Sequence, residues 1–312
     1  MEKKIAVTVC SASHLAQAKG LGDSLLKYNP GYQLVIGLVD KLNGRIPDTY
    51  YHPYELIEAH NLNISQFGKM VERYTLLELS CALKYFFVDH CVKKYKPDKI
   101  IFLDSDILVF DSLEPIEKKL DEFPVLITPH ITSSYPDDGK RPVEKEMLKN
   151  GIYNAGFFAL KTDDTGIKFL NWFKIRMTDQ CYVNAKEAMN ADQSWFNFIP
   201  VYFDKAGQLN HPGCNVAYWN LHEKIISRQN GKYFVNHEPL VFFHYSGYSL
   251  KEPDLISRHQ DRFEMKDNAA INDLFNIYRE NLIQNGHDEM SKIPCYYQKS
   301  SSGLLKKLGL RK

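Results

Sequence analysis

The sequence has no excess of either charge, no long apolar run and no paired cysteine motif. Its 39 Lys and Arg residues nearly balance its 38 Asp and Glu residues, and a net charge of +1 argues against a protein that coats nucleic acid. No run approaches the roughly 18 to 20 apolar residues of a membrane span. The six cysteines form no CxxC pair, so neither a zinc site nor a redox motif is indicated.

The chain also shows no signs of export. The apolar run from Ile5 to Cys10 is too short for the core of a signal peptide and has no cleavage signature. Scattered cysteines favour a reducing compartment, so we expect a cytoplasmic protein. The hydrophobic share of 44% and the charged share of 25% are typical of a folded chain, and 312 residues allow one large α/β domain or two small ones.

The order of apolar runs and helical patterns predicts an α/β fold. An apolar run at 5–9, a helical pattern at 14–28 and a second apolar run at 33–40 form a βαβ unit, which begins a mostly parallel sheet. Further elements are expected in this order: a long helix over 69–94, a strand interrupted by acidic residues over 99–110, a strand over 125–128, a loop over 132–146, a strand over 153–160 with a helix to 177, strands between 231 and 243, and a helix over 267–282.

The strongest chemical feature is the acidic triplet Asp104-Ser105-Asp106, which directly follows an apolar run. If a strand ends there, both carboxylates lie at the carboxyl edge of the sheet, where ligands bind in open α/β folds. Two acids so placed can hold a hard divalent cation whose other ligands are phosphate oxygens and water. About one Asp-x-Asp is expected by chance in such a chain, and an acid pair that caps a helix is the alternative. The preceding apolar run favours the metal site.

Four other segments combine polar residues with turn or aromatic residues. They are VFFHYSGY at 241–248 with His244 and Gly247, GIYNAGFF at 151–158 with Asn154, Ala155 and Gly156, NADQSW at 190–195 with Asp192 and Gln193, and HPGCNVAYWN at 211–220. A histidine after an apolar run can complete a metal shell, and an Asn amide can bind sugar hydroxyls. A core histidine, a turn asparagine, a helix N-cap and a packed aromatic strand are the structural alternatives.

Together these motifs resemble the metal-dependent glycosyltransferases of the GT-A fold, and are most similar to the bacterial group around glycosyltransferase family 8. The resemblance runs from Val7 to about Leu282, through the long helix with Lys84, then LDSD, TPH, YNAGFFAL, ADQSW, HPGCNVAYWNL and FFHYSG. It implies a Rossmann-like mixed, mostly parallel sheet flanked by helices, with a C-terminal helical extension. The implied domain covers 1–285, divided into a nucleotide half (about 1–110), an acceptor half (about 111–250) and the extension (about 251–285); a basic tail follows over 286–312.

The resemblance also implies a role for each site residue. Asp104, Asp106 and His244 correspond to the protein ligands of Mn²⁺ or Mg²⁺, an ion that bridges both phosphates of a nucleotide sugar. The donor-binding positions are Thr8, Cys10 and Ser11 beneath the nucleotide, Asp40 at uracil, Lys84 on the long helix, Ser105 within the acidic triplet, Ala155 and Gly156 along the sugar, and Gly247 with Lys251 at the diphosphate. Asn154, Asp192 and Gln193 are expected at the catalytic centre.

Two features depart from the family pattern. The family usually ends its motif with a His, a Gly three residues later and then Lys-Pro-Trp, whereas Lys251 falls one place late and Glu-Pro follows it. The first loop also lacks the Asp and Tyr pattern with which the family usually binds the base.

The expected activity is transfer of a hexose from UDP-glucose or UDP-galactose to a hydroxyl of a glycan or a lipid-linked saccharide, with retention and with Mn²⁺. Two alternatives stay open. A sugar-nucleotide nucleotidyltransferase also needs two acids and a metal, but residues 7–22 offer only two late glycines and Lys19 for a triphosphate loop. A non-catalytic sugar-binding module fits the aromatic content of 13%, but it has no need for two acids and an ion.

The last residues, 299–312, mix leucines with basic side chains. These are Leu304, Leu305, Leu308 and Leu310 among Lys306, Lys307 and Arg311. Such a segment is either a short amphipathic anchor to an anionic membrane or a frayed, solvated terminus. The first alternative predicts peripheral attachment to the cytoplasmic face of a membrane, where lipid-linked acceptors reside.

Overall fold

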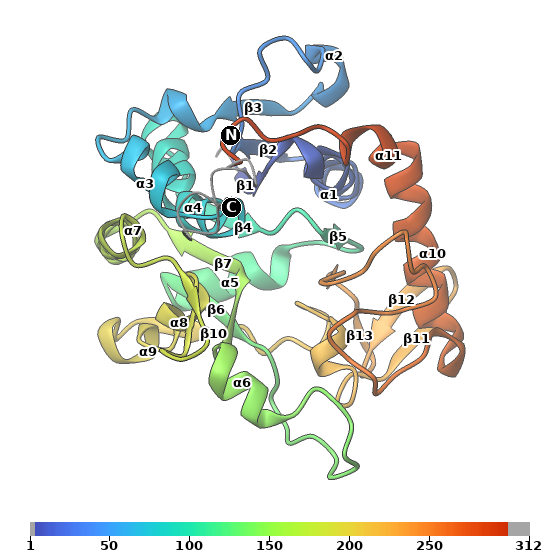
Figure 1. The fold of residues 1–312 in the computed structure, drawn as a ribbon. Coiled ribbons are helices and arrows are strands. Elements are labelled where there is room, and N and C mark those ends of the chain that lie inside the picture. Colours follow the sequence, from blue (N-terminus) through green and yellow to red (C-terminus); the bar gives the residue numbers. More distant parts are fainter. Residues whose placement is uncertain (1–3, 299–312) are drawn as a thin grey trace, which may run out of the picture.

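A seven-stranded sheet forms the centre of the computed structural model, which describes residues 4–298 (Figure 1). In spatial order its strands are β10 (Ala206–Gln208), β6 (Val125–Pro129), β7 (Tyr153–Lys161), β4 (Lys99–Leu103), β1 (Lys4–Cys10), β2 (Tyr32–Leu38) and β3 (Glu55–Glu58). Only β7 runs antiparallel to its neighbours, β4 and β6. The mixed, mostly parallel sheet of the sequence prediction is therefore confirmed, and strands from both sides of residue 110 contribute to it.

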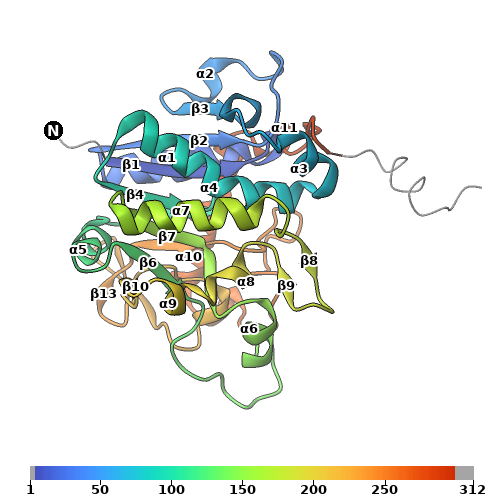
Figure 2. The same ribbon diagram turned by 90° about the vertical axis from the view of Figure 1, so that its left-hand side faces the viewer.

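Helices cover both faces of this sheet. On one face, α4 (Leu76–Tyr95) and α7 (Asp164–Met177) run side by side, as Figure 2 shows. On the other face, α1 (Leu15–Tyr28) and α5 (Glu114–Glu122) pack against the strands. Because both faces are covered, β1 and β2 consist of nearly continuous buried apolar residues, which is why their sequences read as unbroken runs.

The helix expected over 69–94 is two helices, so that prediction is wrong. The first, α3 (Phe67–Arg73), ends before Tyr74, and α4 begins after Thr75. Thr75 caps α4: its Oγ1 accepts from the Glu78 backbone N–H at 3.3 Å, and its own N–H donates to Glu78 Oε2 at 2.8 Å. This reciprocal capping box starts a new helix at a point where the apolar period continues without a gap.

The strand expected over 99–110 is also two strands. β4 stays in the large sheet, whereas β5 (Ile107–Val109) leaves it and pairs antiparallel with β14 (Phe242–His244). The acidic triplet 104–106 forms the turn between β4 and β5, where the Ile107 N–H donates to the Asp104 carbonyl oxygen at 3.2 Å. The chain therefore changes sheets at the two acids.

The C-terminal third forms its own layer. Strands β11 (Ile226–Gln229), β12 (Lys232–Val235) and β13 (Glu238–Pro239) make an antiparallel sheet that shares a core with α10 (Ala269–Gln284). This helix confirms the expected C-terminal helical extension. The remaining elements are short: η1 (Ala12–His14), α2 (Asp48–Tyr51), η2 (Ala59–Leu62), α6 (Glu144–Asn150), β8 (Val183–Asn184), β9 (Met189–Asn190), α8 (Gln193–Phe196), α9 (Ile199–Tyr202), η3 (Tyr218–Asn220), η4 (Met265–Asp267) and α11 (His287–Met290). The segment 132–146, expected as loop, thus contains the start of α6.

Residues 286–298 belong to the segment that was expected as a basic tail over 286–312. In the structure they pack against the end of β2. After α11 the chain crosses that end of the sheet (red in Figure 1), where the Cys295 Sγ donates to the Val39 carbonyl oxygen at 3.2 Å. The Tyr297 ring meets the edge of Phe67 with 5.3 Å between centroids. Residues 299–312, the predicted membrane-binding segment, lie outside the described residues. Between residues 4 and 298, no helix has both the length and the apolar character needed to cross a membrane.

Candidate active site

Three strands bring the predicted metal ligands together. Asp104 follows β4, Asp106 precedes β5, and His244 ends β14, where it pairs with Ile107. The Tyr245 N–H donates to the Asp106 carbonyl oxygen at 2.9 Å, which fastens the two segments. One ligand atom from each of the three residues lies within 4.8 Å of the others, and His244 Nε2 is 3.1 Å from Asp106 Oδ1. The arrangement is compact enough for one ion.

Gly156 in β7 lies directly against this group. Its carbonyl oxygen accepts from the Asp104 N–H at 2.8 Å. A Cβ at this position would lie 2.5 Å from His244 Cε1, 2.8 Å from Asp104 Oδ2 and 2.8 Å from Asn154 Oδ1. The three side chains therefore occupy the space that any larger residue would need, which is the physical reason for glycine here.

Hydrogen bonding orients the His244 ring. Its Nδ1 lies 3.3 Å from Asn215 Oδ1, so that an Nδ1–H donates to the amide oxygen and Nε2 faces Asp106. Burial lowers the pKa of His244, but the Asp106 carboxylate raises it, and the net value is above normal. For Asp106, burial raises the pKa and His244 lowers it, with a net value below normal. A divalent cation bound here would need His244 Nε2 without its proton, as the nitrogen ligand.

Lys84 on α4 connects Asp104 to Asp192. Its Nζ lies 3.0 Å from Asp104 Oδ1 and 3.5 Å from Asp192 Oδ2, and it donates to the Ala155 carbonyl oxygen at 3.0 Å. Burial lowers the pKa of Lys84, but the two carboxylates raise it above its ordinary value. The ammonium group therefore stays charged and holds both acids in fixed positions.

Asp192 pairs with Lys84, and Gln193 lies beside Ala155. Asp192 Oδ2 accepts from the Tyr85 hydroxyl at 2.9 Å, and burial raises the pKa of Asp192. Gln193 Oε1 accepts from the Ala155 N–H at 3.3 Å, while its Nε2 donates to the Asn150 carbonyl oxygen at 2.9 Å. Both side chains are thus held by several partners before any substrate arrives.

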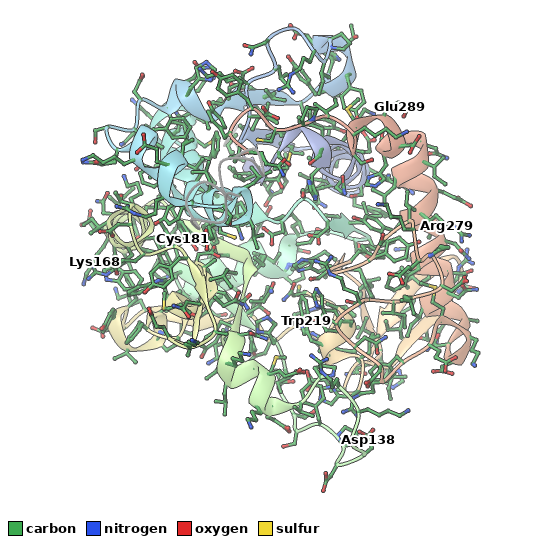
Figure 3. The ribbon with its side chains drawn as sticks, viewed as in Figure 1. Asp138, Lys168, Cys181, Trp219, Arg279 and Glu289 are labelled. Carbon is green, nitrogen blue, oxygen red and sulfur yellow. The ribbon has the colours of Figure 1, made fainter. Side chains whose placement is uncertain are left out.

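Asn154 links Gly156 to His130, whose ring packs against Trp219. Its Oδ1 accepts from the Gly156 N–H at 3.2 Å and from Asn215 Nδ2 at 3.3 Å, and its Nδ2 lies 3.3 Å from His130 Nε2. Burial lowers the pKa of His130 to about 4, so the ring is neutral and its Nε2 accepts the amide proton. Trp219, labelled near the centre of Figure 3, meets the His130 ring edge-on at 5.0 Å.

These residues surround a cavity of about 550 Å³. Among the predicted site residues, the cavity is lined by Lys84, Asp104, Asp106, Asn154, Ala155, Gly156, Asp192, Gln193 and His244. Lining residues that the sequence analysis did not assign include His130, Met147, Tyr218, Trp219, Ser246, Arg258 and His259. Tyr218 and Trp219 belong to the segment 211–220, Ser246 to 241–248 and His130 to the TPH motif, whereas no motif pointed to Arg258 and His259.

The residues predicted beneath the nucleotide do not line this cavity. Thr8, Cys10, Ser11 and Asp40 are all buried at the ends of β1 and β2. Asp40 is 0% exposed, and its Oδ1 accepts from the N–H groups of Lys41 (2.7 Å) and Tyr296 (2.8 Å) and from Arg45 (2.9 Å). Within residues 4–298, Thr8 Oγ1 and Asp40 Oδ2 are buried and have no hydrogen-bond partner. Nucleotide binding by these residues stays a prediction.

Three other predicted residues also lie away from the cavity lining. Ser105 is the middle residue of the acidic turn, and Gly247, with φ +75°, makes the turn that follows β14. Lys251 is exposed, and its backbone N–H donates to Ser249 Oγ at 3.2 Å. The structure therefore does not bring Lys251 into the cavity that Asp104 and Asp106 line.

No family model matches the sequence. Two proteins of Bacillus subtilis (strain 168), both called uncharacterized, are similar in sequence. YfnF is 25% identical over 247 residues, which are 78% of this chain and 81% of YfnF. YfnD is 21% identical over 286 residues, which are 88% of this chain and 87% of YfnD.

Solved structures of glycosyltransferases share the fold. The galactosyltransferase LgtC, in complex with donor and acceptor sugar analogs, aligns with a TM-score of 0.52 at 14% identity, over 93% of this chain and 97% of LgtC. Apo GlyE of Streptococcus pneumoniae TIGR4 aligns with a TM-score of 0.50 at 16% identity, over 95% of this chain. The aligned part is 66% of GlyE, so the chain spans just under two thirds of that protein. The bifunctional WbbM (0.50, 16%) matches 96% of this chain, which spans about half, 52%, of WbbM. The chain therefore has the GT-A type fold that its motifs indicated.

Proposed function

We propose that this protein is a retaining, Mn²⁺-dependent glycosyltransferase that moves a hexose from UDP-glucose or UDP-galactose to a hydroxyl of a glycan or a lipid-linked saccharide. The observation that carries the proposal is the convergence of Asp104, Asp106 and His244 within 4.8 Å, in a cavity that Asn154 and Gln193 also line. The GT-A fold shared with LgtC and WbbM supports the same class of reaction.

The cavity supplies a suitable set of metal ligands. Two carboxylates and one imidazole nitrogen suit Mn²⁺, and the carboxylates also suit Mg²⁺. The space that a Cβ at Gly156 would fill lets Asp104 and His244 approach each other. A divalent ion bound there would neutralise negative charge on the departing diphosphate, which makes UDP a better leaving group.

Asn154, Ala155, Gly156 and Gln193 form the proposed subsite for the donor sugar. The two amides can both donate to and accept from sugar hydroxyls, and their mutual contacts limit their rotation. Gln193 lies beside Ala155, from whose N–H its Oε1 accepts, and lines the cavity together with Asp192, which supports its proposed place at the reacting centre.

We propose a front-face route for retention. The acceptor hydroxyl oxygen bonds to the anomeric carbon as the bond from that carbon to the diphosphate oxygen breaks, and the diphosphate oxygen takes the hydroxyl proton. The Asp192 carboxylate is bound by Tyr85 and lies near Lys84, which favours an electrostatic role over a nucleophilic one. An Asp192→Asn variant that keeps its transfer activity would support this route, because it excludes a covalent intermediate at that carboxylate.

Thr8, Cys10, Ser11 and Asp40 are proposed to form the nucleoside subsite. Cys10 ends β1 and Asp40 follows β2, so both lie at the carboxyl edge of the sheet, where ligands bind in open α/β folds, and this position supports the proposal. Cytoplasmic location and membrane contact through 299–312 stay predictions.

A screen of UDP-sugars for hydrolysis with Mn²⁺ tests the proposal. We expect one or a few UDP-sugars to release UDP, with the activity abolished by a chelator and by the double variant Asp104→Asn, Asp106→Asn. The matched control, Asp137→Asn, changes an exposed acid outside the cavity and should leave the rate unchanged. The proposal is wrong if no UDP-sugar is hydrolysed and none raises the melting temperature with Mn²⁺. Stabilisation by nucleoside triphosphates alone would favour the nucleotidyltransferase, and sugar binding that a chelator does not change would favour the binding module.

A further inference from the structure

Arg258 is a cationic group of the cavity without an acidic partner among the described residues. Two Lys or Arg side chains line the cavity, Lys84 and Arg258. Lys84 is paired with Asp104 and Asp192. Within residues 4–298, Arg258 forms no ion pair, and its only side-chain hydrogen bond runs from Nε to His259 Nε2 at 3.2 Å. Its terminal guanidinium nitrogens are therefore available to a ligand.

The backbone holds Arg258 against the turn that follows the metal-binding histidine. The Arg258 N–H donates to the Gly247 carbonyl oxygen at 3.3 Å. A Cβ at Gly247 would lie 2.5 Å from Ser257 Oγ and 2.6 Å from His259 Cδ2, so the segment 257–259 packs closely on that turn. Ser257 is 1% exposed and its Oγ accepts from the His259 N–H at 3.2 Å. Arg258 is thus attached to the same turn that begins at His244.

Charge balance indicates what Arg258 binds. A divalent ion would balance the carboxylates of Asp104 and Asp106, and Lys84 lies within 3.5 Å of Asp192. The diphosphate of a nucleotide sugar brings about two further negative charges into the cavity. A guanidinium group matches phosphate oxygens in a planar, two-pronged geometry, which an ammonium group does not. Because Lys84 is already paired with carboxylates, Arg258 is the basic side chain of the cavity lining that can bind the diphosphate.

We infer that Arg258, oriented by His259 at the Gly247 turn, binds the diphosphate of the donor, a role that the sequence motif assigns to Lys251. The inference rests on the proposed function. Lys251 is exposed and does not line the cavity, although it lies closer to His244 in the sequence. The basic residue is thus supplied from farther along the chain.

Calorimetric titration of UDP and UMP in the presence of Mn²⁺ tests this inference in the full chain. We expect Arg258→Ala to weaken UDP binding about 10- to 100-fold, as for a lost charge-assisted hydrogen bond. UMP, which lacks the second phosphate, should lose less affinity, and Arg258→Lys should recover part of the loss. The matched control, Lys251→Ala, should bind UDP as the wild type does. Arg258 is exposed, so its replacement should leave the melting temperature nearly unchanged.

Three outcomes would overturn the inference. If Arg258→Ala binds UDP within about twofold of the wild type, Arg258 does not bind the diphosphate, and the proposed function still stands. If Lys251→Ala shows the loss instead, the sequence motif was the better guide. If the wild type binds no UDP with Mn²⁺, the inference and the proposed function both fail.

Discussion

A single methyl group at position 156 is expected to separate the proposed metal ligands Asp104 and His244 without unfolding the protein. The Cβ of Gly156→Ala would lie 2.5 Å from His244 Cε1 and 2.8 Å from Asp104 Oδ2. Ordinary contacts need about 3.5 Å or more, so each side chain must move by roughly 0.5 to 1 Å. Metal sites tolerate changes of only about 0.2 Å in ligand distance, and we expect Mn²⁺ affinity to fall about 10- to 100-fold. The clashing atoms belong to side chains, so we expect a cost in stability of only about 1 to 3 kcal/mol.

Calorimetric titration of Mn²⁺ with UDP present, together with the melting temperature, measures both effects. The control is Gly68→Ala on α3, where a Cβ meets nothing within 4 Å. It should leave Mn²⁺ affinity unchanged and raise the stability of the protein by up to about 1 kcal/mol, because alanine is the better helix former. A Gly156→Ala protein that binds Mn²⁺ as tightly as the wild type would refute the idea that Asp104 and His244 share one ion.

Three further predictions concern the surroundings of the site. Lys84→Met leaves Asp192 buried without its cation, so we expect urea denaturation to give a free energy of unfolding lower by about 3 to 5 kcal/mol; an unchanged value would contradict the ion pair. Burial holds the pKa of His130 at about 4 instead of 6.5, so between these values the unfolded state binds more protons. Between pH 7 and pH 4 the contribution of His130 to the free energy of unfolding should therefore fall by about 3 kcal/mol. Urea denaturation of His130→Asn should show a smaller loss over the same range. Equal losses in the two proteins would mean that the pKa of His130 is not lowered. Thr75→Ala removes the N-cap of α4 and should lower the free energy of unfolding by about 1 kcal/mol in urea denaturation. An unchanged urea midpoint would mean that the capping box does not stabilise the protein.

The sequence predicts those parts of the fold that depend on neighbouring residues. The first βαβ unit and α10 follow from apolar patterns within short windows, and the structure has both. The departure of β5 from the large sheet depends on its pairing with β14, which lies far along the chain. A local pattern of apolar residues is the same for both arrangements, so the strand over 99–110 was predicted as one.

Some residues of the candidate site could be found from the sequence, and others were found only in the structure. The acid pair at Asp104 and Asp106 stood out because it directly follows an apolar run, whereas His244 was placed beside it only by the resemblance to a known order of motifs, and the structure brings the three side chains together. Asn215, which orients the His244 ring, and Arg258 have positions set by the packing of loops, and residue type alone does not reveal them. The capping box that divides the helix over 69–94 was readable as Thr-x-x-Glu, but the apolar period across it gave no reason to expect a break.

The contacts at the end of β2 have a consequence for the order in which the chain folds during synthesis. Val39 and Asp40 accept hydrogen bonds from Cys295 and Tyr296, each of which lies 256 positions later in the sequence. A ribosome releases the N-terminal strands first, so this edge of the sheet waits for almost the whole described chain to emerge. Until then the Asp40 carboxylate lacks one of its three donors and the cover that buries it. The residues that follow β2 are therefore synthesised long before the residues that complete their hydrogen bonds.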